Sequence, residues 1–236
     1  MFSNHPLLKS RAVPQPITRF YKDSRKSTLR ILMLHEFSQS GKRFEQQTKS
    51  LMDELRHVFM CAQSSEIVGS EVRDVYITLV NPPFAIERDA LPPIDLDDAK
   101  RQDTTEDVDA YTWWHLTSKT PPLRCDGLDV TLSSIAQAIH EGGPSHGIIG
   151  FSQGAALAVM ITSLLEHDRK TVFDKAEAMP YPSAFVAKGT AIQEPLKFVI
   201  AMSGIGGVQI PEYYAFYNPK IETPALHILG REDDFI

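Results

Sequence analysis

Residues 147–161 are Gly-Ile-Ile-Gly-Phe-Ser-Gln-Gly-Ala-Ala-Leu-Ala-Val-Met-Ile, and this stretch decides the fold. Its first five residues are apolar or glycine and predict a short buried strand. The small and apolar residues after Gly154 predict the beginning of a tightly packed helix. The two elements meet at Ser152, so the sequence predicts a strand, a sharp turn that carries a serine, and a helix.

The turn has the pattern Gly-x-Ser-x-Gly, from Gly150 to Gly154. In this pattern the serine hydroxyl is raised above the sheet edge, and the strand and helix pass so closely that only glycine leaves clearance. The backbone amide of Gln153 begins the helix and can donate to an oxyanion. The pentapeptide alone is also typical of a glycine-bounded loop. Its flanking strand and helix favour the nucleophile elbow of an α/β-hydrolase.

The composition bounds the class of protein. The chain has 236 residues, 42% of them hydrophobic and 23% charged, which is ordinary for one globular domain. Its net charge of -6 argues against a nucleic-acid partner. No apolar run approaches the ~20 residues of a membrane span. Two cysteines, Cys61 and Cys125, provide neither a disulfide framework nor a metal-binding spacing, which favours reduced thiols inside the cell.

Residues 1–28 form a basic, polar N-terminal extension that Pro14 and Pro16 interrupt. It lacks the apolar centre of a secretory signal. A surface or disordered tail is one interpretation and a mitochondrial presequence is the other, and the missing amphipathic pattern favours the tail. We therefore expect a cytoplasmic protein, with access to the nucleus and import into mitochondria as alternatives.

Residues 29–236 alternate between strand and helix patterns. Strands are expected at residues 30–35, 75–80, 147–151, 198–204 and 225–230, helices at residues 43–59, 127–140 and 153–167, and irregular structure at residues 171–194. Such an alternation builds an α/β domain, with a mostly parallel sheet and helices on both faces. Active sites of these sheets lie at the carboxyl ends of the strands, where His35, Ser152, Ser203 and Asp233 are expected.

Residues 84–124 differ in character from the rest of the domain. They are acidic and interrupted by prolines, and they contain the pair Trp113-Trp114. The segment is too long for a plain connection, so it is either disordered or a lid over a site. The two tryptophans favour local packing, which in a functional interpretation is the wall of a lid.

Four runs of residues carry a family resemblance. They are residues 32–41 (Leu-Met-Leu-His-Glu-Phe-Ser-Gln-Ser-Gly), Trp113-Trp114, residues 147–157, and residues 223–230 (Thr-Pro-Ala-Leu-His-Ile-Leu-Gly). Together they resemble the FSH family of serine hydrolases, over about residues 30–236. The resemblance implies an α/β-hydrolase fold and an enzyme that cleaves carboxylic esters or thioesters through an acyl-enzyme.

The resemblance also implies a site. Ser152 would be the nucleophile, Asp233 the acid of a Ser-His-Asp triad, and the amides of Phe37 and Gln153 the oxyanion hole. The acid orients a histidine, which accepts the serine proton. No metal or organic cofactor is implied, and the expected partner is a small acyl ester or thioester. An apolar acyl group is favoured by five residues that could instead be core: Ile205, Tyr213, Tyr214, Phe216 and Tyr217.

Two features depart from the family pattern. Glu36 occupies the position of a family glycine, so the oxyanion loop could need a different backbone, and a negative charge would lie near an anion site. All eight histidines precede Asp233, whereas the triad histidine of this fold follows the acid.

Three hypotheses account for the missing histidine. In the first, the chain is a serine hydrolase whose sequence is cut short, so that its last strand and helix are missing. The alternative is a catalytically incomplete hydrolase-fold protein that binds a ligand or partner. The third is a chain completed by a second one, through self-association at an exposed sheet edge.

Overall fold

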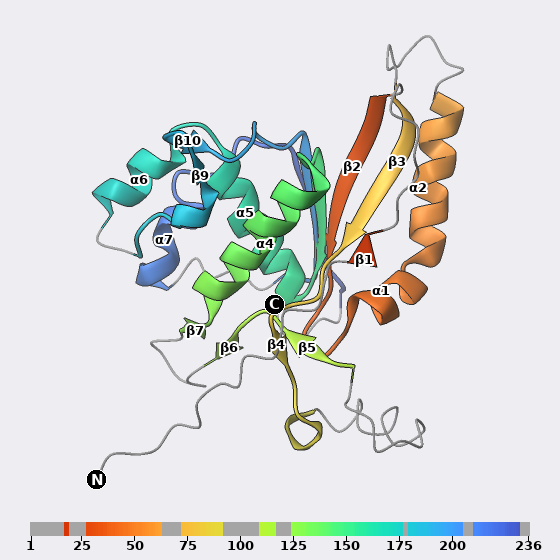
Figure 1. Ribbon diagram of the computed structural model, residues 1–236, viewed down its shortest axis with the longest axis horizontal. Coiled ribbons are helices and arrows are strands. Elements are labelled where there is room, and N and C mark those ends of the chain that lie inside the picture. The colour runs from red at the N-terminus through yellow and green to blue at the C-terminus, as the bar shows by residue number, and fades with distance from the viewer. Residues whose placement is uncertain are drawn as a thin grey trace.

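A six-stranded sheet forms the centre of the protein, as seen in the computed structural model (Figure 1). The structure describes residues 17–18, 27–62, 72–91, 109–116, 124–176, 179–204 and 210–231. Across the sheet, the strands are β1 (Ile17–Thr18), β3 (Val72–Leu79), β2 (Ser27–Leu34), β8 (Gly147–Phe151), β11 (Phe198–Met202) and β12 (Ala225–Ile228). All neighbours pair in parallel except β1, which is antiparallel to β3.

Helices cover both faces of the sheet. Helices α1 (Gly41–Gln47) and α2 (Lys49–Ala62) lie on one side, and α4 (Leu128–Gly142) and α5 (Gln153–Leu165) lie on the other (Figure 1). Strand β2 shows why both faces of the sheet are apolar. Leu29, Ile31 and Met33 enter the core beside α2, whereas Leu32 and Leu34 enter the core beside α4 and α5. Successive strand residues point to opposite faces, so the part of β2 that lies between the two helix layers, residues 31–34, is apolar throughout. The predicted α/β architecture is confirmed.

Shorter elements connect this framework. They are β4 (Phe84–Ala85), η1 (Arg88–Ala90), β5 (Tyr111–Thr112), β6 (His115–Leu116), β7 (Cys125–Asp126), α6 (Arg169–Lys175), η2 (Ser183–Phe185), β9 (Val186–Ala187), β10 (Thr190–Ala191), η3 (Pro211–Tyr213) and α7 (Tyr214–Tyr217). Pairs β4–β5, β6–β7 and β9–β10 are small antiparallel ladders. Helices α6 and α7 pack against α5.

Two predicted elements were wrong in detail. The helix expected at residues 43–59 is two helices that meet at Thr48, whose hydroxyl donates to the Phe44 carbonyl at 2.6 Å. A threonine that bonds back in this way bends a helix. Residues 171–194 were expected to be irregular, yet α6 extends into them, supported by an ion pair between Lys170 and Asp174 at 2.7 Å.

The tryptophan pair within residues 84–124 packs into the body of the domain, whereas Ile86, Leu91 and Ala110 form a small cluster of their own. Trp113 and Trp114 are buried in the core that α4 and α5 form, which agrees with the local packing expected of them. Tyr213 and Phe216 belong to the same core, so these two rings are not free to line a substrate pocket. Residues 92–108 and 117–123, where a lid was considered, lie outside the described residues, as does Ile205.

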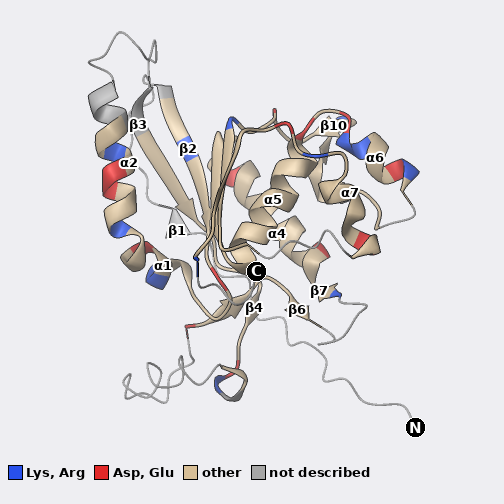
Figure 2. Cartoon of the chain, turned by 180° about the vertical axis from the view of Figure 1, so that it is seen from behind, with Lys and Arg blue, Asp and Glu red and all other residues tan. Residues whose placement is uncertain are grey.

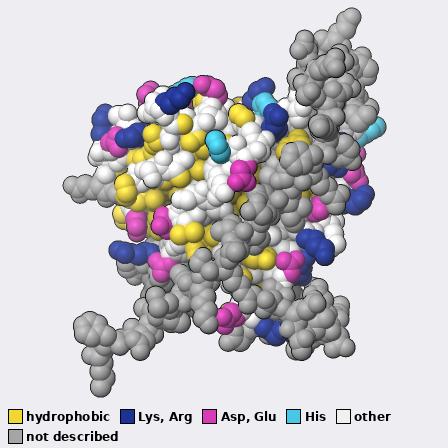
Figure 3. Space-filling view, viewed as in Figure 1, with side chains coloured by type: hydrophobic (Ala, Val, Ile, Leu, Met, Phe, Trp, Pro, Cys, Tyr) yellow, Lys and Arg dark blue, Asp and Glu magenta, His cyan; other side chains and the backbone are white. Residues whose placement is uncertain are grey.

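The surface is mixed in character. Basic and acidic side chains alternate along α2 and α6 (Figure 2). Apolar side chains gather over the side of the molecule that carries α4, α5 and α6, with charged groups around them (Figure 3). In the part of the chain that the structure describes, no helix is long and apolar enough to cross a membrane.

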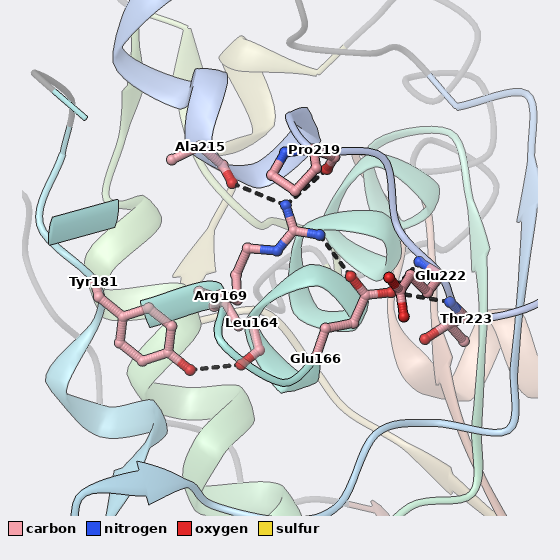
Figure 4. Close-up of polar contacts among 8 residues, drawn as sticks. All are labelled: Leu164, Glu166, Arg169, Tyr181, Ala215, Pro219, Glu222 and Thr223. Carbon is pink, nitrogen blue, oxygen red and sulfur yellow. Dashed lines mark hydrogen bonds and ion pairs between the residues drawn. The ribbon is translucent and has the colours of Figure 1, made fainter. Parts of the chain in front are cut away.

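A buried ion pair fixes the approach to strand β12 (Figure 4). Glu166 and Arg169 have side chains only 9% and 2% exposed, and their charged groups lie 2.5 Å apart. The Arg169 guanidinium also donates to the carbonyl of Pro219 at 2.8 Å. The second Glu166 oxygen accepts from the backbone amides of Glu222 and Thr223, at 2.5 and 2.9 Å. The pair therefore holds the chain that enters β12 against the end of α5.

We predict that Arg169→Met lowers the free energy of unfolding by about 3–5 kcal/mol, because it leaves the Glu166 carboxylate buried without its cation. Lys170→Met is the matched control, since it breaks an exposed ion pair one residue along the same helix. That control should cost about 0.5 kcal/mol or less. Urea denaturation measures both values, and equal losses for the two variants would contradict the assigned role.

Candidate active site

Ser152 lies on the turn between β8 and α5, as the sequence predicts. Its backbone has φ 51 and ψ -114, a conformation that non-glycine residues rarely adopt. Its amide donates to the Met202 carbonyl of the neighbouring strand at 2.8 Å, so the turn is bonded to β11. A strained backbone held by its surroundings is typical of a functional position.

The two glycines of the motif are required by close packing. A Cβ on Gly150 would come within 3.0 Å of the Gly154 carbonyl, and one on Gly154 would come within 3.0 Å of the Leu34 and His35 carbonyls. Real Cβ atoms essentially never come so close to backbone atoms. The first turn of α5 therefore rests directly on the ends of β8 and β2.

The loop after β2 is tied to strand β5. Ser38 has a left-handed φ of 62, and its amide donates to the Tyr111 carbonyl at 3.0 Å. The Tyr111 amide donates in turn to the Gln39 carbonyl at 2.9 Å. Below this bridge, the Ser40 hydroxyl donates to the Asp109 carboxylate at 2.6 Å. These bonds fix the loop that contains Phe37.

The backbone amides of Phe37 and Gln153 lie at matching positions in the fold. Leu34 pairs with Gly150 in the register of β2 and β8, and each amide belongs to the residue three positions further on. Within the described residues, neither amide donates a hydrogen bond. Gln153 is the first residue of α5, where helical geometry leaves the amide without an internal partner. Two amides without a partner among the described residues thus follow the ends of adjacent strands, and one of them belongs to the residue after Ser152.

Glu36 does not itself adopt a left-handed backbone in the loop after β2. The left-handed conformation falls on Ser38, and Glu36 itself has no positive φ. Its carboxylate accepts from the Gln39 side-chain amide at 2.9 Å, and the same amide donates to Gln47 at 2.8 Å. The glutamate is therefore engaged in a polar network on the α1 side of the loop.

The side chain of Gln153 makes contacts that the sequence did not reveal. Its oxygen accepts from the Trp113 amide at 3.0 Å and from the Thr112 hydroxyl at 3.1 Å. Its nitrogen donates to the Trp114 carbonyl at 3.0 Å. The tryptophan pair marked residues 113–114 as packed, but no sequence signal connected them to a glutamine about forty positions away.

His35 is buried beside this site and is held neutral. Burial lowers the pKa of His35 to about 4, although a hydrogen bond to the Glu36 carbonyl partly opposes the shift. Its Nδ1 donates to that carbonyl at 2.7 Å. His146 Nδ1 accepts from the Arg30 amide at 2.9 Å. In both imidazoles Nδ1 is thus bonded to the backbone, and among the described residues His35 Nε2 has no hydrogen-bond partner, so we assign the role of catalytic base to neither.

The remaining predicted site residue is Asp233, which lies outside the described residues. Among the residues that are described, no three His, Cys, Asp or Glu side chains gather as ligands for a metal ion. What the structure describes of the predicted site is therefore Ser152 on its turn and the amides of Phe37 and Gln153, which follow the ends of adjacent strands. This arrangement suits a nucleophile and the stabilisation of an oxyanion.

Comparisons with known proteins identify the relatives of the chain. The family described as "Serine hydrolase (FSH1)" matches residues 24–236. Esterase OVCA2 of Xenopus tropicalis is 28% identical over 221 residues, which cover 90% of this chain and 76% of that protein. The protein named dihydrofolate reductase in Schizosaccharomyces pombe is 35% identical over 108 residues, 46% of this chain but only 20% of that protein. The crystal structure of Zea mays acyl-protein thioesterase 2 has a TM-score of 0.46 at 13% identity, covering 88% of this chain and 72% of that one, a likeness too low to inform function.

The neutral His35 predicts a pH-dependent stability. The folded-state pKa of about 4 lies below the ordinary value of 6.5, so the unfolded chain takes up this proton first as the pH falls. The part of the free energy of unfolding that depends on this pKa difference is fully present above pH 6.5 and is lost as the pH falls towards 4. The loss amounts to about 3 kcal/mol. His35→Asn should remove this part of the decline. Unfolding free energies of both proteins across this range measure the difference, and parallel curves would contradict it.

Proposed function

The chain belongs to the FSH1 family of serine hydrolases, and from this premise we propose that it cleaves carboxylic esters or thioesters of apolar acyl groups, with Ser152 as nucleophile. That it is a hydrolase of this family follows from the match over residues 24–236. The substrate class and the role of each residue are the proposal. One observation supports the proposal most strongly. Ser152 has a strained φ of 51, on a turn so closely packed that only glycine fits at positions 150 and 154.

In the proposed reaction, the Ser152 hydroxyl attacks the acyl carbonyl and its proton passes to a base. The carbonyl oxygen becomes an oxyanion, which accepts hydrogen bonds from the amides of Phe37 and Gln153. The alcohol or thiol leaves with a proton, and water then releases the acid from the acyl-enzyme. The turn is thus a nucleophile elbow, and the start of α5 adds its positive helix end to the stabilisation of the oxyanion.

Asp233 is the proposed acid of the triad. It comes five residues after β12, whose parallel neighbour β11 lies beside β8. The carboxyl ends of these three strands meet at one edge of the sheet, which supports a role at the Ser152 site for a residue shortly after β12. Its carboxylate would orient the base and stabilise the imidazolium formed during attack.

An apolar acyl group is favoured by the side chain of Phe37. This ring is 40% exposed although it belongs to the loop that supplies a proposed oxyanion donor. An exposed ring at that position can contact the acyl chain of a bound ester. The frog relative carries the name esterase, which agrees with ester cleavage by this chain.

We further propose a cytoplasmic location. Cys125 is a free thiol, and burial raises its pKa to about 11, so it stays protonated at neutral pH. A thiol without a bridging partner is ordinary in a reducing compartment.

We predict that a fluorophosphonate labels Ser152 and that Ser152→Ala abolishes both labelling and ester hydrolysis, by about a thousandfold or more in kcat. Ser203→Ala is the matched control, since Ser203 also follows a parallel strand and has a positive φ of 48. That variant should keep its labelling. Peptide mass spectrometry locates the label, and hydrolysis of esters of increasing acyl length tests the substrate class. A folded protein that is labelled elsewhere, or not at all, would overturn the proposal.

We also propose self-association of two copies through strand β12. It is the last strand in the order of the described sheet, and Leu226 and Ile228 are 54% and 46% exposed there. An edge strand with exposed apolar side chains favours pairing with a second chain.

We expect Leu226→Lys to convert a dimer into a monomer, because a charge on this edge opposes pairing. Val130→Lys is the control, since Val130 is similarly exposed, at 45%, but belongs to α4. Sedimentation velocity measures the mass of each protein. A wild type that stays monomeric at high concentration would reject self-association.

A further inference from the structure

Residues 112–114 lie between the two elements that carry the proposed oxyanion donors. On one side is the first turn of α5, with the amide of Gln153. On the other is the loop after β2, with the amide of Phe37. Each element is hydrogen-bonded to this same short segment or to its immediate neighbour Tyr111. The segment is therefore placed to fix the distance between the two donors.

Residues 112–114 contact α5 through the whole polar end of the Gln153 side chain. Its oxygen accepts two hydrogen bonds, from the Trp113 amide and the Thr112 hydroxyl, and its nitrogen donates one to the Trp114 carbonyl. An amide that accepts on one atom and donates on the other can be satisfied in only one orientation. The bonds thus fix the side chain of the residue whose backbone amide is the donor.

Residues 112–114 contact the loop after β2 through the indole of Trp113. Its N–H donates to the His35 carbonyl at 2.8 Å, and its ring lies 5.5 Å from the His35 imidazole. Three and four residues further along, Ser38 and Gln39 bond to Tyr111 through the backbone. Phe37 lies between these fixed points, so its amide has little freedom to move.

The segment itself is rigid. Thr112 and Trp113 are fully buried, at 0% exposure. The Thr112 hydroxyl shares its single proton between the Trp114 carbonyl, at 2.7 Å, and the Gln153 side-chain oxygen, at 3.1 Å. The Trp113 carbonyl accepts from the hydroxyl of Thr131 in α4. A buried segment held by these hydrogen bonds keeps its shape during a reaction, as preorganised stabilisation of an oxyanion requires.

We infer that residues 112–114, together with the side chain of Gln153, position the two amides that bind the oxyanion. This inference rests on the proposed function, because it concerns donors that only a hydrolytic reaction uses. Thr112, Trp113 and the Gln153 side chain are positioning groups, since they act through the backbone of Phe37 and Gln153. Their loss should weaken binding of the transition state and leave binding of the ground-state ester unchanged.

The test compares Gln153→Met and Thr112→Val with the wild type. Gln153→Met keeps the length of the side chain, and Thr112→Val keeps its shape. A misplaced oxyanion donor costs about 10–100-fold in kcat for Gln153→Met and about 3–10-fold for Thr112→Val, with KM changed less than about twofold. Affinity for an alkyl trifluoromethyl ketone, whose adduct with serine carries an oxyanion, should fall by the same factors.

Tyr181→Phe is the control for a purely structural loss. The Tyr181 hydroxyl donates to the Leu164 carbonyl at 2.5 Å, at the opposite end of α5, so its removal also deletes one bond to a backbone carbonyl (Figure 4). This variant should lose stability and keep kcat within about twofold, because it leaves the first turn of α5 in place.

The outcomes separate the inference from the proposed function. If the wild type hydrolyses esters through Ser152 while Gln153→Met and Thr112→Val keep its kcat and ketone affinity, the inference alone is wrong. If kcat falls only in proportion to the folded fraction, the groups are structural and the inference is also wrong. If the folded wild type is neither labelled at Ser152 nor active, the proposed function fails, and the inference fails with it.

Discussion

The first turn of α5 touches the ends of β8 and β2 without any side chain between them, and the rest of the site depends on this contact. Gly150 and Gly154 permit it, since a Cβ at either position would overlap backbone atoms. The contact forces the chain to reverse sharply at Ser152, whose amide is bonded to β11. It also places the first turn of α5 against the carbonyls of Leu34 and His35, where the loop after β2 begins. Backbone packing thus sets the turn that carries Ser152 and the start of α5 beside the end of β2.

Close packing at the two glycines does not by itself hold the loop after β2 in place. The parallel sheet and residues 111–114 do so. Parallel pairing of β2, β8 and β11 aligns the carboxyl ends of the strands, so that the loop after β2, Ser152 and Ser203 lie along one edge. The buried indole of Trp113 and the side chain of Gln153 then join the loop to the helix. A region that looks like an acidic insertion in the sequence thus provides, in its described part, a support for the site.

The architecture could be predicted because it depends on local patterns. The apolar runs of β2, β8 and β11 and the period of α4 identify the layers, and the spacing of two glycines around Ser152 identifies the turn. Other features depend on contacts between distant residues. The break at Thr48 depends on one side-chain hydrogen bond within an otherwise regular helical pattern. The bonds from Gln153 to residues 112–114 depend on tertiary packing, which no spacing encodes. Asp233 was predicted from family resemblance and lies outside the described residues.

The most direct measurement is a crystal structure of the protein after reaction with an alkyl fluorophosphonate. We expect a phosphorus atom bonded to the Ser152 oxygen, with the phosphoryl oxygen about 3 Å from the amides of both Phe37 and Gln153. The bonds from Gln153 to Thr112, Trp113 and Trp114 should remain in place, because the site is preorganised. A phosphonate on another residue, or a phosphoryl oxygen directed away from both amides, would contradict the account.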